Sequence, residues 1–331
     1  MPLLNKMKIN YFIKKSKLQW IPFDELKNIR EIGKGGFSNV YSATYKNLTV
    51  ALKEFLETHD GSTFFLDKVE ANVKINVEIY GITCRNIHTN KYMMVGRYAD
   101  KGNLRHYLSN NFATLSWKPK LEILRSIILD LISIHNEGYI HRNLHSGNIL
   151  LFSNDVTRGI EAHIDLGSSK KTDRSTICVE IYGVLPYIAP EVLLNKRCKK
   201  ESDIYSLGVI MSEISTGRLP LDDESHDGEL MLKIINGLRP KFASGTPDCY
   251  IQLSNRCMNA DPTKRPTIDE IYKDIDTWCS ELFLGKKDLE IRNEFLAADK
   301  IVPTLSFTSQ RHPNAIYTSR LINTEKSFKY L

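Results

Sequence analysis

The spacing of apolar residues along the chain changes near residue 100. Residues 29–55 have a strand-like pattern, in which glycines mark a turn and mostly β-forming residues follow it. Residues 64–75 carry apolar side chains at helical spacing, and residues 92–95 form a short apolar run typical of a buried strand. We therefore expect a small β-rich region with one main helix in this part of the chain.

After Gly102 the pattern becomes helical. Residues 121–135 and 202–215 each have apolar residues at helical spacing, and similar stretches recur up to Leu284. The whole chain is thus predicted to have an α+β fold. A small antiparallel β-sheet lobe with one main helix is followed by a large and mostly helical lobe.

Pattern and composition together predict three segments. The first is rich in lysine, the second carries the two lobes, and the third is polar with weak periodicity. We expect the third to be either partly disordered or packed back on the domain. The predicted segments are a basic N-terminal leader at 1–24, a domain at 25–282 (small lobe 25–97, hinge 97–102, large lobe 103–282) and a polar C-terminal tail at 283–331.

The composition is that of an ordinary soluble globular protein. Of the 331 residues, 42% are apolar and 25% are charged. The six cysteines form no C-x-x-C pair, which argues against a zinc site or a disulfide framework. Free thiols in a reducing compartment follow, so we expect a cytoplasmic location. No apolar run is long enough to cross a bilayer, and the first twenty residues lack the apolar core of a secretory signal.

The net charge of +6 is concentrated at the N-terminus. The first twenty residues hold five lysines and no acid, so the rest of the chain carries about +1. A nearly neutral domain argues against nucleic acid as the main partner. The basic leader could contact an acidic partner or an anionic membrane surface, but a solvated and frayed terminus is the simpler interpretation.

Seven short motifs follow one another along the chain. The first is rich in glycine, which lets backbone N–H groups approach phosphate oxygens closely, and the second ends a strand in lysine. Either alone is weak, because glycine-rich hairpins are usually turns and strand lysines are usually surface charges. The motifs are Gly33-Lys34-Gly35-Gly36-Phe37-Ser38-Asn39-Val40, Val50-Ala51-Leu52-Lys53, His141-Arg142-Asn143-Leu144-His145-Ser146-Gly147-Asn148, Asp165-Leu166-Gly167, Ala189-Pro190-Glu191, Ser202-Asp203-Ile204-Tyr205-Ser206-Leu207-Gly208 and Lys264-Arg265-Pro266-Thr267.

As a set, in this order and at these separations, the motifs are highly specific. The chain resembles a eukaryotic protein kinase over about residues 25–280, closest to the tyrosine-kinase-like group and especially to the expanded kinase families of fungi. The resemblance implies the two-lobed protein-kinase fold. It also implies ATP and Mg²⁺ as cofactors, and a protein substrate or a protein partner in signalling.

The resemblance implies a role for each matching position. Lys53 would hold the α- and β-phosphates of ATP, and Asn148 and Asp165 would ligate Mg²⁺. The other nucleotide-binding positions would be Ile32, Gly33, Gly35, Ser38, Val40, Ala51, Gly96, Arg97, Tyr98 and Ala99.

Five further positions would be architectural. Asp203 would anchor the backbone of the loop at His141 and Arg142, and Glu191 and Arg265 would form a buried ion pair. Removing one partner of such a pair typically costs ~3–5 kcal/mol, because the other charge stays buried.

The main departure from the family is Asn143, which replaces the catalytic aspartate. That aspartate accepts the proton of the substrate hydroxyl, whereas an amide cannot take up a proton at neutral pH. A general base typically contributes ~10²–10⁴-fold in rate, yet phosphoryl transfer relies mostly on positioning and electrostatics. We expect Asn143 to cripple transfer without necessarily abolishing it. A relocated base at His145 has no support in the sequence.

A second departure lies in the predicted helix. Lys68, fifteen residues after Lys53, stands where the family has the glutamate that pairs with this lysine, so two like charges are expected to face one another. Asp67 and Glu70 point in other directions on a helix. An alignment shifted by one or two residues is the alternative, because the stretch after Lys68 is shorter than in the family.

Two smaller departures concern the nucleotide site. Ser38 replaces the third glycine of the first motif, and Gly96 replaces the usual apolar residue before the hinge. A glycine at this position would open space beside the adenine. Drift in a site no longer used for turnover is the preferred explanation.

These losses and retentions favour a pseudokinase that binds ATP and Mg²⁺ but transfers phosphate poorly. One alternative is an active but slow serine/threonine kinase, and a second is a nucleotide-free interaction scaffold with the same fold. Arg142 favours control by a phosphate on the following segment, with unmodified loop hydroxyls as an equal alternative. The candidate phosphosites are Ser168, Ser169, Thr172, Ser175, Thr176 and Tyr182.

Overall fold

The protein divides into two compact units. The computed structural model describes residues 2–35, 38–56, 61–74, 78–85, 91–154, 159–167, 169–171, 180–284, 289–304 and 310–324. The first unit comprises Met1–Asp100 with Leu166–Ser169, and the second comprises Lys101–Asp165 with Lys170–Leu331. The first is rich in β-structure and the second is mostly helical, so the expected two-lobed α+β fold class is confirmed.

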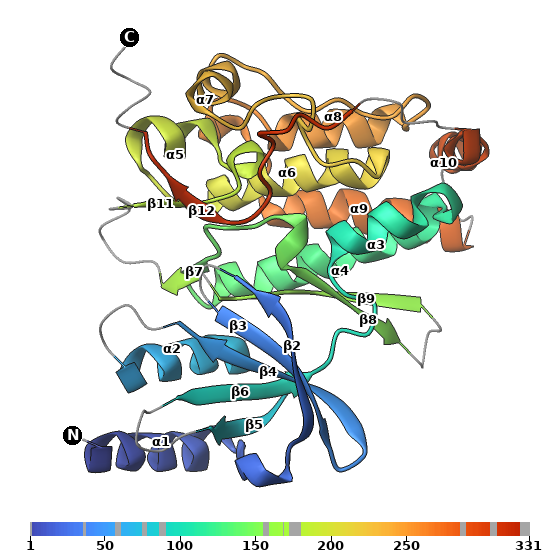
Figure 1. Ribbon diagram of the computed structural model, residues 1–331. Helices are drawn as coiled ribbons and strands as arrows, with labels where there is room; N and C mark the ends of the chain where they lie inside the picture. Colours follow the sequence, from blue (N-terminus) through green and yellow to red (C-terminus); the bar gives the residue numbers. More distant parts are fainter. Residues whose placement is uncertain are drawn as a thin grey trace. The chain divides into compact units, whose positions relative to one another are not determined.

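A six-stranded sheet forms the body of the first unit, in the order β1-β5-β6-β4-β3-β2 (Figure 1). Its neighbours pair in antiparallel fashion except for the short parallel contact of β1 with β5. The strands are β1 (Gln19–Trp20), β2 (Lys27–Lys34), β3 (Ser38–Tyr45), β4 (Leu48–Phe55), β5 (Ile79–Cys84) and β6 (Tyr92–Arg97).

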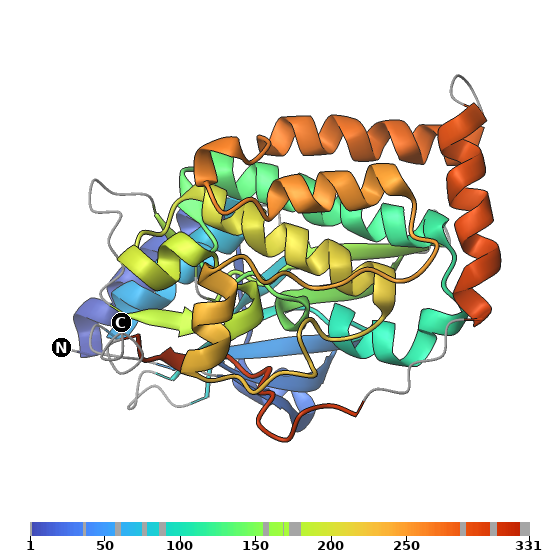
Figure 2. The same cartoon turned by 90° about the horizontal axis from the view of Figure 1, so that it is seen from above.

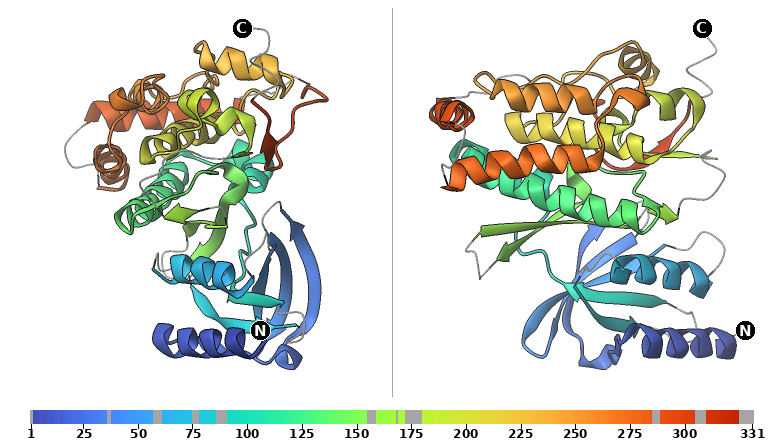
Figure 3. Two further views of the ribbon diagram at one scale, coloured as in Figure 1. Left: turned by 90° about the vertical axis from the view of Figure 1, so that its left-hand side faces the viewer. Right: turned by 180° about the vertical axis from the view of Figure 1, so that it is seen from behind.

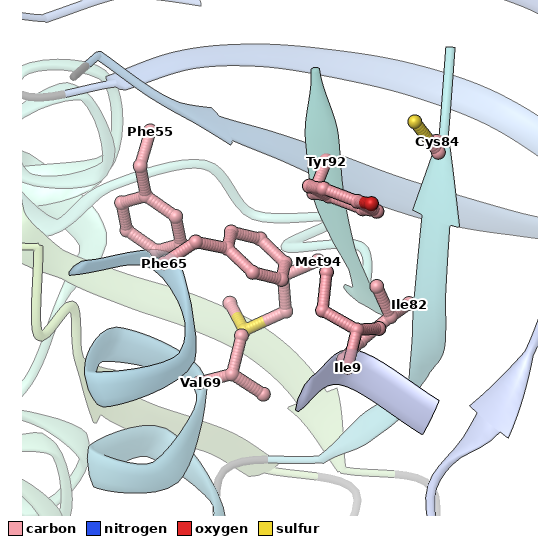
Figure 4. Close-up of a cluster of buried hydrophobic side chains, with 8 residues drawn as sticks. All are labelled: Ile9, Phe55, Phe65, Val69, Ile82, Cys84, Tyr92 and Met94. Carbon is pink, nitrogen blue, oxygen red and sulfur yellow. The ribbon is translucent and has the colours of Figure 1, made fainter. Parts of the chain in front are cut away.

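Each face of this sheet carries its own apolar cluster. Strand side chains alternate between faces, so Leu52 and Val95 belong to one cluster while Phe55 and Met94 belong to the other. Helix α2 (Gly61–Lys74), which matches the helix expected at 64–75, packs Phe65 against the second cluster (Figure 4). The ring centroids of Phe55 and Phe65 are 6.1 Å apart.

The N-terminal residues differ from the frayed terminus that the sequence suggested. Pro2–Ser16 form helix α1, which lies beside β5 in the first unit (Figure 1). Ile9 is 1% exposed and joins the cluster on the α2 side of the sheet, with Phe12 and Ile13 packed against it. The correction has a physical reason: apolar residues spaced three and four apart form a narrow stripe that burial stabilises, although lysines surround it.

The second unit is built on eight α-helices within the described residues. Helices α4 and α9 lie side by side (Figure 3), and α6 packs closely on α8. A Cβ atom on Gly208 of α6 would lie 2.9 Å from the Cβ atom of Cys257 in α8, so glycine suits this close approach. The helices are α3 (Leu104–Asn111), α4 (Trp117–Asn136), α5 (Pro190–Asn195), α6 (Lys200–Thr216), α7 (Gly228–Ile235), α8 (Asp248–Cys257), α9 (Ile268–Leu284) and α10 (Leu289–Ile301).

Short strand pairs and 3-10 turns frame the loops of this unit. Strand β7 (Tyr139–Ile140) pairs with β10 (Lys170–Lys171), and β8 (Ile149–Asn154) forms a hairpin with β9 (Gly159–Ile164). The third motif therefore spans the loop between β7 and β8. The 3-10 turns, including one in the first unit, are Phe23–Glu25, Phe112–Thr114, Ser146–Asn148, Leu185–Tyr187, Pro262–Lys264 and Val302–Thr304.

The described parts of the C-terminal tail are packed on the second unit, which is one of the two alternatives expected. Helix α10 runs crosswise to α9 (Figure 2). Phe295 of α10 is fully buried, with its ring 5.4 Å from Trp117 and 5.7 Å from Trp278 between centroids. Farther along, β12 (Arg320–Ile322) pairs in antiparallel fashion with β11 (Ile181–Gly183).

The structure bears on the expected absence of a membrane span and on the expected free thiols. Among the described residues, no helix is both long and apolar enough to cross a membrane. Cys84, Cys249, Cys257 and Cys279 are free thiols, but Cys198 is disulfide-bonded. The expectation of free thiols throughout the chain is therefore wrong at Cys198, because a spacing rule for cysteines cannot detect partners that the fold brings together.

Lys120 of α4 is buried among aromatic rings. Its Nζ lies 4.0 Å from the ring centroid of Phe112 and 5.0 Å from that of Trp117. No hydrogen-bond partner for this Nζ exists among the described residues. Burial lowers the pKa of Lys120 to about 7, although the negative charge of Asp299 opposes the shift. The ammonium form is therefore a destabilising element of the second unit.

Replacing Lys120 by methionine should flatten the pH dependence of stability. The pKa of Lys120 is lower in the folded chain than its ordinary value of 10.5, so the unfolded chain binds more protons from about pH 7 to 10.5. Stability should therefore rise with pH in this window. From pH 7 to 8.5, the free energy of unfolding of the native chain should rise by about 1–2 kcal/mol more than that of Lys120→Met in urea titrations.

Lys118→Met is the matched control, because Lys118 is an exposed lysine two positions away on the same helix. This control should keep the native pH dependence. The same pH dependence in native protein and Lys120→Met would contradict the prediction.

Candidate functional site

The carboxylate of Asp203 holds the loop between β7 and β8. Its Oδ2 accepts hydrogen bonds from the backbone N–H of His141 at 2.9 Å and shares one with His135 Nε2 at 2.9 Å. Its Oδ1 accepts from the backbone N–H of Arg142 at 3.0 Å. Burial alone would raise the pKa of Asp203, but these partners lower it below its ordinary value. The buried group therefore stays an anion at neutral pH.

This anchor supports an uncommon backbone conformation. Arg142 has φ +69°, in the left-handed region that non-glycine residues rarely occupy. The conformation lets two successive N–H groups point at one carboxylate, which offsets the strain. It also fixes the direction in which the next residue, Asn143, leaves the loop.

Asn143 meets a residue that the sequence analysis did not single out. Its Nδ2 donates to the hydroxyl oxygen of Ser319 at 2.9 Å, and His145 Nε2 lies 2.9 Å from the same oxygen. Ser319 directly precedes β12, in the part of the chain expected to be tail. The only available signal was a strand-like run of apolar, aromatic and β-branched residues at 315–322.

The proton on His145 can be assigned from its contacts. The backbone N–H of Gly147 donates to His145 Nδ1 at 3.1 Å, so Nδ1 is an acceptor and the proton sits on Nε2. Burial, assisted by the charges of Arg105 and His141, holds the pKa of His145 well below its ordinary value. His145 is therefore neutral at physiological pH and donates its Nε2 hydrogen to Ser319.

The two candidate metal ligands lie next to each other in the second unit. Asn148 precedes β8 and Asp165 follows β9, and these strands pair from Ile149 opposite Ile164. The backbone N–H of Asp165 donates to the carbonyl of Asn148 at 2.8 Å. Carboxylate and amide oxygens are the ligands that Mg²⁺ prefers, so this pair fits the ion by its chemistry.

Further hydrogen bonds orient these ligands. Asn148 Nδ2 donates to the carbonyl of Asn143 at 2.9 Å, which turns its amide oxygen the other way. His141 Nε2 lies 2.7 Å from the carbonyl of Asp165. The loop that Asp203 anchors is thus joined to both candidate ligands.

The positions of the first unit that are expected to bind nucleotide lie in the sheet or directly next to it. Val40 of β3 pairs directly with Lys53 of β4, and Ala51 of β4 pairs with Gly96 of β6. Directly paired residues point to the same face, so these four positions lie together on the α2 side. Ile32 and Gly33 lie in β2, and the backbone N–H of Gly35 donates to the carbonyl of Ser38 at 2.9 Å across the glycine-rich turn. Arg97 ends β6, and Tyr98 and Ala99 follow it as partly buried, irregular backbone.

Lys53 and Lys68 are both buried, at 7% and 6% exposure. Lys53 Nζ lies 5.1 Å from the ring centroid of Phe55. Lys68 Nζ donates to the carbonyl of Ser169 at 2.7 Å. A main-chain acceptor therefore receives the Lys68 ammonium, which accommodates a lysine on the inner side of α2.

Asp67 and Glu70, the two acids considered as substitutes for the expected glutamate, have other surroundings. Glu70 forms an ion pair with Lys74 one turn along α2, with Oε1 2.9 Å from Nζ. Asp67 is exposed, and partial burial followed by the charge of Glu70 raises its pKa. Lys68 is thus the charged residue that α2 buries among its described side chains.

Gly96 has a structural reason that drift does not supply. A Cβ atom at this position would lie 3.1 Å from the carbonyl oxygen of Glu78, tighter than ordinary contacts. This carbonyl accepts a hydrogen bond from the N–H of Arg97 at 3.1 Å, just before a register irregularity between Ile79 and Gly81 of β5. A larger residue at 96 would require that backbone to shift.

Only two of the candidate phosphosites lie within the described residues. Ser169 is 4% exposed, and its hydroxyl has no hydrogen-bond partner there. Tyr182 is half-buried in β11, opposite Leu321 of β12. The other four candidates, Ser168, Thr172, Ser175 and Thr176, lie outside the described part of the chain.

Glu191 and Arg265 form a bidentate ion pair. Arg265 Nη1 lies 2.8 Å from Glu191 Oε1, and Nη2 lies 2.7 Å from Oε2. The Arg265 side chain is fully buried, and it also donates to the carbonyls of Glu201 and Asn259 at 2.7 and 2.9 Å. The pair ties α5 to the segment before α9.

Glu191→Gln should destabilise the second unit strongly. The change leaves the buried guanidinium of Arg265 without its counter-charge, which typically costs ~3–5 kcal/mol. The free energy of unfolding, measured with urea, should fall accordingly.

The control variant is Glu224→Gln, which breaks the partly exposed pair of Glu224 with Lys233, whose atoms are 2.9 Å apart. It should have a much smaller effect, because water and salt screen exposed pairs. Equal losses of stability in the two variants would show that burial does not govern the Glu191 pair.

The chain is similar in sequence to known protein kinases. The profile of the family described as "Protein tyrosine and serine/threonine kinase" matches residues 26–275. "Cyclic GMP-binding protein C" of Dictyostelium discoideum is 30% identical over 285 residues, which cover 75% of this chain and 11% of that protein. The "Probable serine/threonine-protein kinase roco5" of the same organism is 27% identical over 273 residues, covering 76% and 10% of the two chains.

A plant protein gives a similar match. A "Probable leucine-rich repeat receptor-like protein kinase" of Arabidopsis thaliana is 30% identical over 264 residues, which cover 72% of this chain and 23% of that protein. The chain thus spans from about a tenth to about a quarter of the length of these relatives. The similarity concerns one region of each of them.

Proposed function

The chain belongs to the protein tyrosine and serine/threonine kinase family, and from this premise we propose that it is a signalling protein with impaired phosphotransfer that binds ATP and Mg²⁺. The observation that carries the proposal is the amide of Asn143. It occupies the position of the family's general base and donates a hydrogen bond to a hydroxyl oxygen. A group that donates to the oxygen cannot remove its proton.

Nucleotide binding is supported by the positions that remain. Lys53 is the cation that the family uses for phosphates, and Gly33 and Gly35 belong to the glycine-rich motif that the family uses to cover them. Asn148 and Asp165 supply adjacent oxygen ligands for Mg²⁺. The ion, when bound with ATP, would neutralise negative charge on the phosphates.

Impaired transfer is also supported by α2. The family uses a glutamate at position 68 to orient the strand lysine, and this chain has Lys68, which donates to the carbonyl of Ser169. Two groups that act in transfer are therefore changed, while Lys53, Asn148 and Asp165, which the family uses for the phosphates and Mg²⁺, are kept. This combination favours a binding and conformational role over turnover.

Partners and location complete the proposal. The family implies protein substrates or protein partners. We further propose that the chain descends from serine/threonine kinases and groups with the tyrosine-kinase-like kinases, near the expanded fungal families. We also propose that a phosphate on the segment that includes Tyr182 controls the protein. A cytoplasmic location accords with the four free cysteines but not with the disulfide at Cys198. The exposed lysines of α1 could contact an anionic membrane surface.

Addition of ATP and Mg²⁺ should raise the melting temperature of the chain. A ligand at 100 times its Kd stabilises the folded state by about 2.7 kcal/mol, which is readily detected as a thermal shift. Lys53→Met and Asp165→Asn should each reduce the shift, while Lys118→Met should not. No shift at millimolar ATP in the native chain would favour the nucleotide-free scaffold instead.

Restoring the base should restore chemistry. Asn143→Asp should raise the rate of transfer from radiolabelled ATP by about 10²-fold or more, with casein and the chain itself as acceptors. Asn236→Asp, a change at an exposed amide, is the control. If Asn143→Asp were no faster than the native chain, Asn143 would not limit transfer. Robust turnover by the native chain would favour the active serine/threonine kinase.

A further inference from the structure

The segment that carries Ser319 lies as a bound peptide on the second unit. We propose that residues 315–322 fill, within the same molecule, a binding site for an extended peptide, with Ser319 held in the place of the phosphoacceptor residue. The site is here named the acceptor surface, and its members are Arg105, Asn143, His145, Ile181, Tyr182, Gly183 and His226. The role of Ser319 as a phosphoacceptor mimic rests on the proposed function of Asn143. The peptide site itself rests only on the contacts described below.

Main-chain contacts fix the segment in an extended form. Strand β12 adds to the edge of β11 with Ile322 opposite Ile181 and Arg320 opposite Gly183 (Figure 1). Before the strand, Arg105 Nη1 donates to the carbonyl of Tyr317 at 2.8 Å. Strand addition of this kind recognises any peptide backbone, so it does not require this particular sequence.

His226 contacts the backbone of the same segment on the N-terminal side of Ser319. Its backbone N–H donates to the carbonyl of Asn314 at 3.2 Å, and its Nδ1 lies 2.8 Å from the carbonyl oxygen of Ile316 and 3.1 Å from the amide nitrogen of the same residue. Its backbone carbonyl in turn accepts a hydrogen bond from Arg320. One histidine thus holds three positions of the segment, which keeps residues 314–320 in a single register.

Side chains of the segment divide between buried and exposed. Ala315, Tyr317 and Ile322 are at most 8% exposed, whereas Thr318 is exposed and Leu321 is 52% exposed. The Tyr317 ring lies 4.7 Å from His226 between centroids. Its hydroxyl donates to the carbonyl of Pro220 at 2.7 Å. The acceptor surface therefore selects an aromatic residue two positions before the central hydroxyl and an aliphatic residue three positions after it.

At the centre, the hydroxyl of Ser319 is bound and not activated. Asn143 Nδ2 and His145 Nε2 both donate to its oxygen, so two hydrogen bonds occupy the lone pairs that would attack a phosphate. The side chain of Asn143 lies close to the backbone of β11, since a Cβ atom on Gly183 would lie 3.1 Å from Asn143 Oδ1. The segment thus blocks the site as an inhibitor resembling a substrate.

Competition follows from the covalent link. A tethered segment acts at an effective concentration in the millimolar range, so it outcompetes an equivalent free peptide present at micromolar concentration. A partner protein with the same pattern, an extended serine or threonine segment with the flanking aromatic and aliphatic residues, would bind only when the tail is displaced.

The test uses the full chain and a fluorescein-labelled synthetic peptide of residues 310–324, with affinity measured by fluorescence anisotropy. Ser319→Val removes the hydroxyl from a partly exposed position, and Tyr317→Ala removes the buried ring. Each weakens the docked tail, so the peptide should bind each variant at least tenfold more tightly than the native chain. Thr318→Ala, at the exposed neighbour, should bind it as weakly as the native chain.

Amide hydrogen exchange gives a second readout. Exchange at Ile181–Gly183 should be faster in Ser319→Val and in Tyr317→Ala, because β11 loses its partner, and unchanged in Thr318→Ala. Ser319→Val keeps the test decisive even if Tyr317→Ala does not fold. Equal peptide affinity for the native chain and Ser319→Val, or no binding to either variant, would overturn the proposal.

The thermal shift with ATP and Mg²⁺, measured on the same samples, separates the two proposals. Peptide binding by the variants without any ATP shift would refute nucleotide binding and leave the acceptor surface intact. An ATP shift without peptide binding would refute the acceptor surface alone.

Discussion

The buried carboxylate of Asp203 is the interaction on which the candidate site depends. It receives two backbone N–H groups and a histidine in a place where water cannot substitute for them. An unpaired group in such a place costs about 1–3 kcal/mol, so the three partners and the carboxylate stabilise one another as a unit. The left-handed Arg142 persists because this unit determines its backbone.

The loop that Asp203 anchors also positions the other candidate site residues of the second unit. Asn143 leaves the loop in the direction set by Arg142, and its carbonyl accepts the side-chain amide of Asn148. His141 reaches the carbonyl of Asp165. One carboxylate therefore positions both Asn143 and the two candidate metal ligands.

An asparagine at 143 differs from the aspartate expected there in more than the ability to accept a proton. A carboxylate can only accept hydrogen bonds, whereas an amide can also donate. Donation from Asn143, together with donation from neutral His145, gives the oxygen of the tail hydroxyl two donors, whereas a carboxylate at 143 could only accept the proton of that hydroxyl. Position 143 thus serves as a binding group for a hydroxyl. An amide at this position is therefore suited to retaining a segment of the chain's own tail.

Much of the fold followed from local pattern. The helix expected at 64–75 is α2 at Gly61–Lys74, and the strand expected at 92–95 is β6 at Tyr92–Arg97, because period and burial agree in both. Helix α1 was not expected, since its narrow apolar stripe lies among lysines. The acceptor for Lys68 could not be predicted either, because Ser169 lies 101 positions away and offers only a main-chain carbonyl.

The sequence by itself determined which chemical groups are available to the candidate site: an amide at 143, a lysine at 68, and the side chains of Lys53, Asn148 and Asp165. It also determined the α+β class, because hydrophobic period is a local property of the chain. Only the tertiary structure decided what these groups contact. The meeting of Asn143 with Ser319 joins residues 176 positions apart, and no local pattern encodes such a distance. The contact between Asn143 and Ser319 accompanies the antiparallel pairing of β12 with the edge of β11.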